Sequence, residues 1–188
     1  MLEIQQNVGV RDAVAAFWDV FGQDSSLEAE ISEVLTTAGV LKSAFNEPIE
    51  SKEDLVSAFL KDRHEMWMRW FEAEIEARYQ ATGGGLEIIA DVLQEGFEDP
   101  KCFGVAFIHI VTVGGGFNNA PFIIAREQKE HLRRFLERLA TEMGLQHPDM
   151  VAYEAVRVIE QAIARTLMIC SLAEAQTARL LFRCLQHT

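Results

Sequence analysis

The sequence predicts an all-α fold, and three observations support this prediction. Between its joints, apolar residues recur three or four positions apart, which is the spacing of one face of a helix. The 4 prolines and 12 glycines gather mostly at the joints, where helices would begin or end. No stretch shows the alternation of apolar and polar residues that is typical of a half-buried strand.

Three short helices are expected in the first fifty residues. The first ends at Gly22 and carries one apolar stripe, made of Val10, Val14, Phe17 and Phe21. The second covers about residues 27–36. The third follows Ala38-Gly39-Val40, is about seven residues long and closes at Pro48, because proline cannot donate a helical hydrogen bond.

A long helix opens at Ser51, which with Asp54 forms an acidic capping box, and it ends before Gly83-Gly84-Gly85. Its expected inner face contains Leu55, Phe59, Leu60, Trp67 and Phe71. Further helices are expected over about 86–97, 101–113, 120–143, 148–169 and 171–186. Pro148 opens the fourth of these, and a capping box of Ser171 and Glu174 opens the fifth.

Composition places the chain among soluble globular proteins of one domain or two small ones. Its 188 residues are 49% hydrophobic, and 17 Lys+Arg stand against 29 Asp+Glu, a net charge of −12. The three cysteines, Cys102, Cys170 and Cys184, are far apart, so neither a disulfide framework nor a zinc cluster is predicted. No basic and apolar leader opens the chain, and the apolar run 102–113 is too short to cross a bilayer as a helix. A cytoplasmic location is therefore expected.

Two motifs in register connect this organisation to a known family. Ala38-Gly39-Val40 lies between two short helices, and Ser51-Lys52-Glu53-Asp54-Leu55 opens the long helix. This arrangement resembles the TetR/AcrR family of transcriptional regulators, in which an A-G-V turn joins the helices of a helix-turn-helix and an S-K-E-x-L box starts the fourth helix. The segment from Phe103 to Ile108 is similar to the family's F-x-G-C-x-F-I-N segment, with Val105 and His109 in place of Cys and Asn.

The resemblance covers about residues 9 to 170 and implies a two-part, all-α chain. Residues 1–50 would form a three-helix head of the helix-turn-helix type, and residues 51–188 a helical domain for effector binding and dimerisation. The implied function is that of a regulator, expected to be a repressor, whose affinity for duplex DNA is controlled by a small, mostly apolar effector. No other cofactor is implied. The positions that match the family's DNA-contacting segment are Lys42, Ser43, Ala44, Asn46 and Lys52.

The charge of the head opposes DNA binding. Residues 1–50 contain only Arg11 and Lys42 as cations, against nine carboxylates, which leaves a net charge of −7. A protein draws most of its affinity for a duplex from cations set against phosphates, and carboxylates add repulsion. Pro48 should also cut short the helix that would lie in the major groove. The alternative is therefore a TetR-like sensor or interaction protein whose degenerate head no longer binds DNA.

An aromatic stretch on the long helix suits the wall of an apolar pocket. In His64-Glu65-Met66-Trp67-Met68-Arg69-Trp70-Phe71, positions 64, 67, 68 and 71 share one face. The predicted pocket residues are His64, Trp67, Met68, Phe71, Phe103, Phe107, His109 and Phe122. Ordinary core packing is the alternative for each aromatic. His64, His109 and His131 have no close helical spacing, so no metal site is predicted.

The last two expected helices carry apolar stripes backed by small residues. The resemblance implies that they form a four-helix bundle across a two-fold axis, which makes the chain a homodimer. The predicted interface contains Val151, Ala155, Ile159, Ala162, Ile163, Ala178, Leu181, Phe182 and Leu185. The alternative is that these stripes pack inward.

The sequence lacks the patterns of the enzymes that such a chain could be. No Glu-x-x-His pair is present, as a di-iron bundle would need. Gly83-Gly84-Gly85 and Gly114-Gly115-Gly116 have no strand before them and no Lys-Ser/Thr after them, as a phosphate-binding loop requires. No catalytic residue is therefore predicted.

Overall fold

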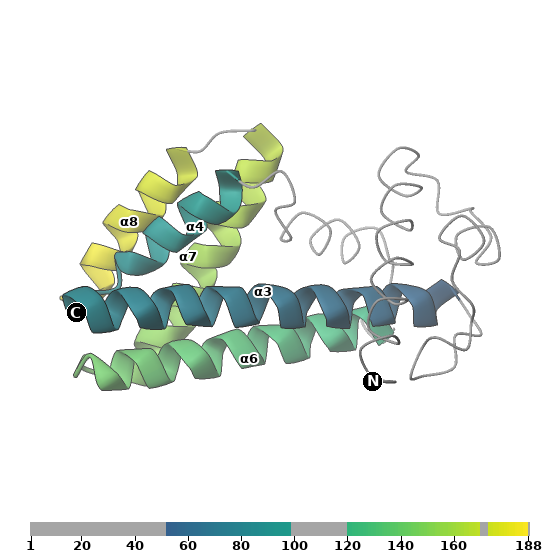
Figure 1. Cartoon of the computed structure of the whole chain (residues 1–188), viewed down its shortest axis with the longest axis horizontal. Helices are drawn as coiled ribbons and strands as arrows, with labels where there is room; N and C mark the ends of the chain where they lie inside the picture. Colours follow the sequence, from purple (N-terminus) through teal and green to yellow (C-terminus); the bar gives the residue numbers. More distant parts are fainter. Residues whose placement is uncertain (1–51, 99–119, 170–172, 188) are drawn as a thin grey trace. The chain divides into compact units, whose positions relative to one another are not determined.

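The computed structural model describes residues 52–98, 120–169 and 173–187 of the chain. These residues form helices joined by turns, and they contain no strand, so the all-α fold class is confirmed. The described helices are α3 (Lys52–Thr82), α4 (Ile88–Glu98), α6 (Ala120–Glu142), α7 (Pro148–Ile169) and α8 (Ala173–Leu185) (Figure 1). Their starts and ends lie within two residues of the expected ones. The helices expected in residues 1–50 and over 101–113 lie outside the described residues.

The chain divides into two units, Met1–Asp62 and Arg63–Thr188. Helix α3 begins in the first unit and continues into the second without a break in its helical backbone. The second unit contains most of α3 together with α4, α6, α7 and α8. None of the helices described is both long enough and apolar enough to span a membrane.

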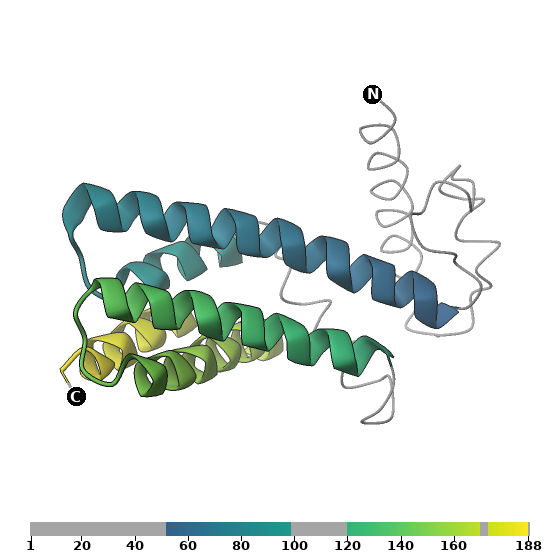
Figure 2. The ribbon, with the colours of Figure 1, turned by 90° about the horizontal axis from the view of Figure 1, so that it is seen from below.

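Within the second unit, α3 and α6 lie side by side and run in the same direction (Figure 2). Two side-chain contacts join them along their length. Arg138 Nη2 donates to Glu76 Oε1 at 2.9 Å, and the Tyr79 hydroxyl donates to the carbonyl oxygen of Glu142 at 3.1 Å. The contact that lies later on α3 also lies later on α6, so the two helices are parallel.

Helices α6, α7 and α8 pack in chain order, and α4 packs against α8 (Figure 1). Two polar contacts join α4 to α8. Asp91 forms an ion pair with Arg179, and Gln176 Nε2 donates to Gln94 Oε1 at 3.1 Å. These contacts lie three residues apart on each helix, so they hold the register of the pair.

The hydrophobic core draws side chains from all five described helices. Each fully buried large side chain contributes about 1.5–3 kcal/mol relative to an exposed one. The largest of them are Phe71, Phe182, Met68, Ile75, Leu86, Ile89, Leu136 and Ile159. Because every helix supplies at least one, the burial of one helix depends on the presence of the others.

Helix α6 ends in a Schellman motif that turns the chain back into α7. Gly144 has a positive φ of 70°, which a residue with a side chain adopts only at a cost. Its N–H donates to the carbonyl of Thr141 at 3.0 Å, and the N–H of Leu145 donates to the carbonyl of Ala140 at 3.0 Å. This turn directs α7 to pack against α6.

The core assignment of Phe71 gives a first prediction. We expect Phe71→Ala to lower the free energy of unfolding by about 3–5 kcal/mol, because it removes a buried ring and leaves a cavity. Urea denaturation of the full chain, followed by circular dichroism, measures the change. Gln80, which is exposed on the same helix, offers the control. Gln80→Ala should change the free energy of unfolding by no more than about 0.5 kcal/mol, and an equally small loss for Phe71→Ala would contradict the assignment.

Candidate functional site

The predicted pocket residues on α3 lie at the α3–α6 contact. The Phe71 ring is fully buried and meets the Phe135 ring edge to face, with their centroids 6.1 Å apart. Trp67, which is half-buried, stacks on Phe71 with centroids 4.5 Å apart. Met68 is buried in the same cluster. Aromatic pairs with these geometries stabilise packing beyond the area they bury, and α3 therefore presents a filled aromatic face here.

The remaining predicted pocket residues are not placed by the structure. Phe103, Phe107 and His109 lie outside the described residues. Phe122 belongs to α6, but its side chain is not among those described. The apolar pocket assembled from these residues and α3 therefore stays a prediction.

His64 of α3 contacts His131 of α6. His64 Nε2 lies 3.2 Å from His131 Nδ1, and the two rings pack edge to face with centroids 5.3 Å apart. On its other side, His131 Nε2 lies 3.4 Å from Glu72 Oε1. Glu72, His131 and His64 thus form a line of three titratable groups across the α3–α6 contact, which we name the histidine relay.

The environment of His64 opposes its charged form. Burial removes water from the imidazole, and a positive charge on His131 would repel a second one. Together these effects lower the pKa of His64 from about 6.5 to about 4. At neutral pH, His64 is therefore uncharged. A single proton lies between the two facing nitrogens, so one hydrogen bond joins His64 to His131.

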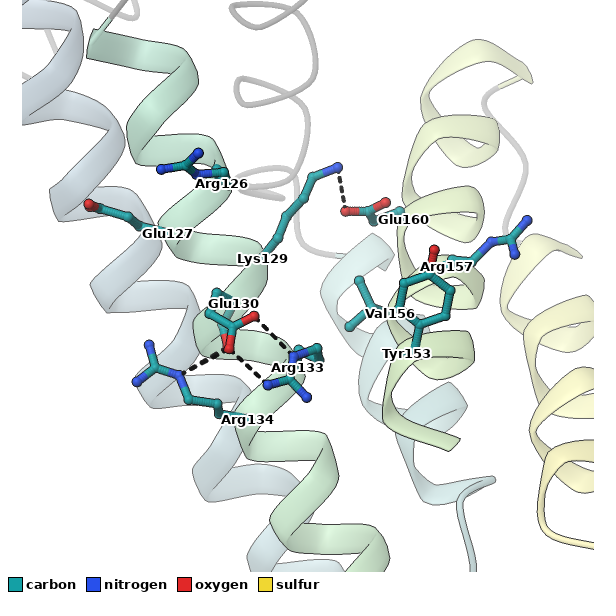
Figure 3. Close-up of a pocket in the computed structure, with 10 residues that line it drawn as sticks. All are labelled: Arg126, Glu127, Lys129, Glu130, Arg133, Arg134, Tyr153, Val156, Arg157 and Glu160. Atoms are coloured by element: carbon teal, nitrogen blue, oxygen red, sulfur yellow. Dashed lines mark hydrogen bonds and ion pairs between the residues drawn. The ribbon is translucent and has the colours of Figure 1, made fainter. Parts of the chain in front are cut away.

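A surface groove of about 610 Å³ lies between α6 and α7 (Figure 3). Its lining residues are Arg126, Glu127, Lys129, Glu130, Arg133, Arg134, Tyr153, Val156, Arg157 and Glu160. Lys129 of α6 reaches Glu160 of α7, with Nζ 2.8 Å from Oε1. Figure 3 shows this pair joining the two walls of the groove.

The charges of the groove are largely paired with one another. Arg133 donates to Glu130 at 2.8 Å and to Glu137 at 2.7 Å. These hydrogen bonds lower the pKa of the Glu130 carboxyl and raise the pKa of Arg133, so both are charged at neutral pH. Because most of its cations already have carboxylate partners, the groove is a polar surface feature and differs from the apolar pocket that was predicted.

Most of the predicted dimer-interface residues are buried inside this chain. The six that belong to its core are Val151, Ala155, Ile159, Ala162, Ala178 and Phe182. Ile163 and Leu185 are half-buried and pack against that core. Only Leu181 is exposed, at 41%. The apolar stripes therefore pack inward and leave little side-chain surface for a second copy.

Other large apolar side chains of the same helices are exposed. Met150 and Tyr153 on α7 and Leu180 on α8 each expose more than half of their surface. Because α7 and α8 run in opposite directions, the first turns of α7 and the last turns of α8 lie at the same end of the pair (Figure 1). These side chains were absent from the predicted interface, although their spacing of three residues on α7 and their position beside Leu181 on α8 could have indicated them.

The predicted DNA-contacting residues lie almost entirely outside the description. Lys42, Ser43, Ala44 and Asn46 fall in residues 1–51, which the structure does not describe. Lys52 is the first residue of α3, and its side chain is not described. In the part of the chain that is described, no three His, Cys, Asp or Glu side chains come together as metal ligands would.

The chain is similar to a solved structure over nearly its whole length. That structure is the crystal structure of a TetR transcription regulator from Haloarcula marismortui ATCC 43049. The TM-score is 0.72 and the sequences are 19% identical, with 96% of this chain and 97% of that chain covered. No protein-family model matches the chain, and no curated protein matches it. The similarity establishes a TetR-like all-α fold for this chain.

Proposed function

We propose that this chain is a TetR-like transcription regulator that represses by binding duplex DNA as a homodimer. The observation that carries the proposal is the structural similarity to a TetR transcription regulator over 96% of the chain. The register of Ala38-Gly39-Val40 with Ser51-Lys52-Glu53-Asp54-Leu55 supports it independently. In this proposal residues 1–50 form the DNA-reading head, with Lys42, Ser43, Ala44, Asn46 and Lys52 at the DNA, and residues 51–188 form the regulatory domain. The protein acts in the cytoplasm and is not an enzyme.

The proposed regulation runs through α3. This helix extends without a break from Lys52, which follows the head in the sequence, to Thr82, and its middle contacts α6 through Phe71. A ligand that alters the packing around Phe71 would move α3, and a helix transmits such a movement along its axis. The effector would lower DNA affinity only by its difference in affinity between the two positions of α3.

The proposed effector is small and mostly apolar. Trp67, Met68 and Phe71 present an aromatic and thioether face at the α3–α6 contact, which suits a flat hydrophobic compound. Phe103, Phe107, His109 and Phe122 complete the pocket in this proposal. The described part of that face is closed by its own packing, so effector binding requires these side chains to rearrange.

A second candidate function rests on the charge of the head. With two cations against nine carboxylates, residues 1–50 repel a polyanion. In this alternative the chain is a TetR-like sensor or interaction protein that binds an effector and a protein partner without reading DNA. A mixed dimer with a DNA-competent homologue would then carry one reading head.

The proposed homodimer uses exposed apolar side chains of α7 and α8. Met150 and Tyr153 on α7 and Leu180 and Leu181 on α8 supply exposed apolar surface for this contact. A two-fold axis would set this surface against its own copy, which is the commonest arrangement of a homodimer. The buried stripe behind it, from Val151 to Phe182, would support the surface without contacting the partner.

Charge reversal in the head separates the two candidate functions. We expect the pair Glu47→Lys and Glu50→Lys to bind genomic duplex fragments more tightly than the wild type, with a steeper loss of affinity as salt rises. Each new phosphate contact should add about 0.9 to the slope of log affinity against log salt. Fluorescence anisotropy at two salt concentrations measures both quantities.

The control pair Glu87→Lys and Glu98→Lys makes the same change of net charge within the second unit. If both pairs of substitutions raised the affinity for duplex DNA equally, the gain would come from the net charge of the chain and not from the head. No binding by the wild type or by the head variant at tens of micromolar would contradict the DNA-binding proposal and favour the second candidate.

The proposed interface gives a further prediction. We expect the wild type to sediment as a dimer, and Leu180→Glu with Leu181→Glu to sediment as a folded monomer of 21.2 kDa, because buried carboxylates would face their own copies across the axis. Ile123→Glu is the matched control, since Ile123 is an exposed apolar residue on α6, at 43%. Analytical ultracentrifugation distinguishes the outcomes. A monomeric wild type, or a control that dissociates equally, would contradict this interface.

A further inference from the structure

The histidine relay joins two helices through groups that can gain and lose protons. His64 belongs to α3 and His131 to α6, and 3.2 Å separates their facing nitrogens. Glu72, two turns after His64 on α3, lies 3.4 Å from the second nitrogen of His131. In the described residues, the polar and ring contacts of both imidazoles connect α3 to α6.

The relay accommodates the neutral form of both rings. The carboxylate of Glu72 favours a proton on His131 Nε2, which leaves the lone pair of His131 Nδ1 directed at His64. His64 then donates its Nε2 proton to that lone pair. Each of the three groups thereby has a partner at the α3–α6 contact.

One added proton also fits the relay. A protonated His131 donates from Nε2 to Glu72 and from Nδ1 to His64, while His64 keeps its single proton on Nδ1 and accepts at Nε2. The hydrogen bond reverses its direction, and the contact survives. When a second proton is added, the two rings can no longer form a hydrogen bond. Two N–H groups and two positive charges would then face each other across 3.2 Å.

We propose that the histidine relay is a proton-operated clasp between α3 and α6. It retains one added proton with the helices in contact, and a second proton opens it and separates the helices at His64. The later contacts of the same helices, Glu76 with Arg138 and Tyr79 with Glu142, involve no histidine and remain closed. The clasp therefore acts on the stretch of α3 that adjoins the first unit.

The neighbouring charges do not offset the second proton on His64. On α3, Lys61 lies three residues before His64 and Glu65 one residue after it, and the two carry opposite charges. On α6, Glu127 and Arg134 lie one turn before and after His131 and carry opposite charges. Glu72 contacts His131 and not His64.

The direction of the pH effect follows from the pKa of His64. Its folded-state pKa is about 4, below the ordinary value of about 6.5, so between these values the unfolded chain binds more protons than the folded one. The contribution of His64 to stability is fully present above about pH 6.5 and is lost as the pH falls toward 4.

The test follows the five histidines of the full chain by NMR, from pH 8 to pH 4, through the Cε1–H signals. We expect His64 to change tautomer before it becomes charged, and to become charged only near pH 4. His131→Gln removes the neighbouring charge and should move the titration of His64 to higher pH. His187→Gln, at an exposed position after α8, is the control and should leave it unchanged. Titration of His64 at its ordinary pKa of about 6.5 would overturn the proposal.

A second readout detects whether the helices separate. Trp67 lies one turn from His64, and the tryptophan fluorescence of the chain should change in the same acid range in the wild type but not in His64→Gln. The urea midpoint should likewise fall less between pH 6.5 and pH 4 in that variant than in the wild type. If the fluorescence and the urea midpoint depended on pH in the same way in the wild type and in His64→Gln, protonation of His64 would not separate the helices, and the proposal would be wrong. Neither readout requires DNA, so the outcome is independent of the proposed function.

Discussion

The burial of Phe71 is the contact that holds α3 against α6, and the position of α3 in the second unit depends on it. Its ring has no exposed surface, meets Phe135 edge to face and supports the stacked ring of Trp67. These rings fix both the separation and the register of two parallel helices. Because the register is fixed, His64 comes to lie opposite His131. The polar chemistry of this contact is thus a consequence of its apolar packing.

Polar side chains at the margins of the core specify how the helices pair, whereas the core supplies stability. Exposed ion pairs such as that of Lys129 with Glu160 contribute about 0–1 kcal/mol each, far less than one buried aromatic ring. They matter because a shifted register would break several of them together. The Asp91–Arg179 pair plays this part between α4 and α8. A ligand that displaces α3 therefore has to overcome packing, while the surface pairs determine where the helix comes to rest.

The sequence was sufficient to predict the five described helices, because their ends depend on local signals such as Pro148 and Gly83. It was not sufficient to say what covers each apolar face. The stripe through Ala155 and Ile159 was expected to meet a second copy, yet other helices of the same chain bury it. Periodicity identifies a buried face but not its partner. The contact of His64 with residue 131 escaped prediction for a related reason, since 67 positions separate the two and only tertiary packing sets the register.

The parallel arrangement of α3 and α6 has a consequence for the order of folding. Parallel neighbours cannot be joined by a short turn, and the contacts between these helices close loops of 59 to 67 residues. Helices α6 and α7, in contrast, are joined by a tight turn at Gly144. Since closing a long loop costs more entropy, we expect the α6–α7 hairpin to form early and α3 to dock late. In a stopped-flow refolding experiment, the native tryptophan fluorescence should then return after most of the helical circular dichroism, and simultaneous recovery would argue for concerted docking.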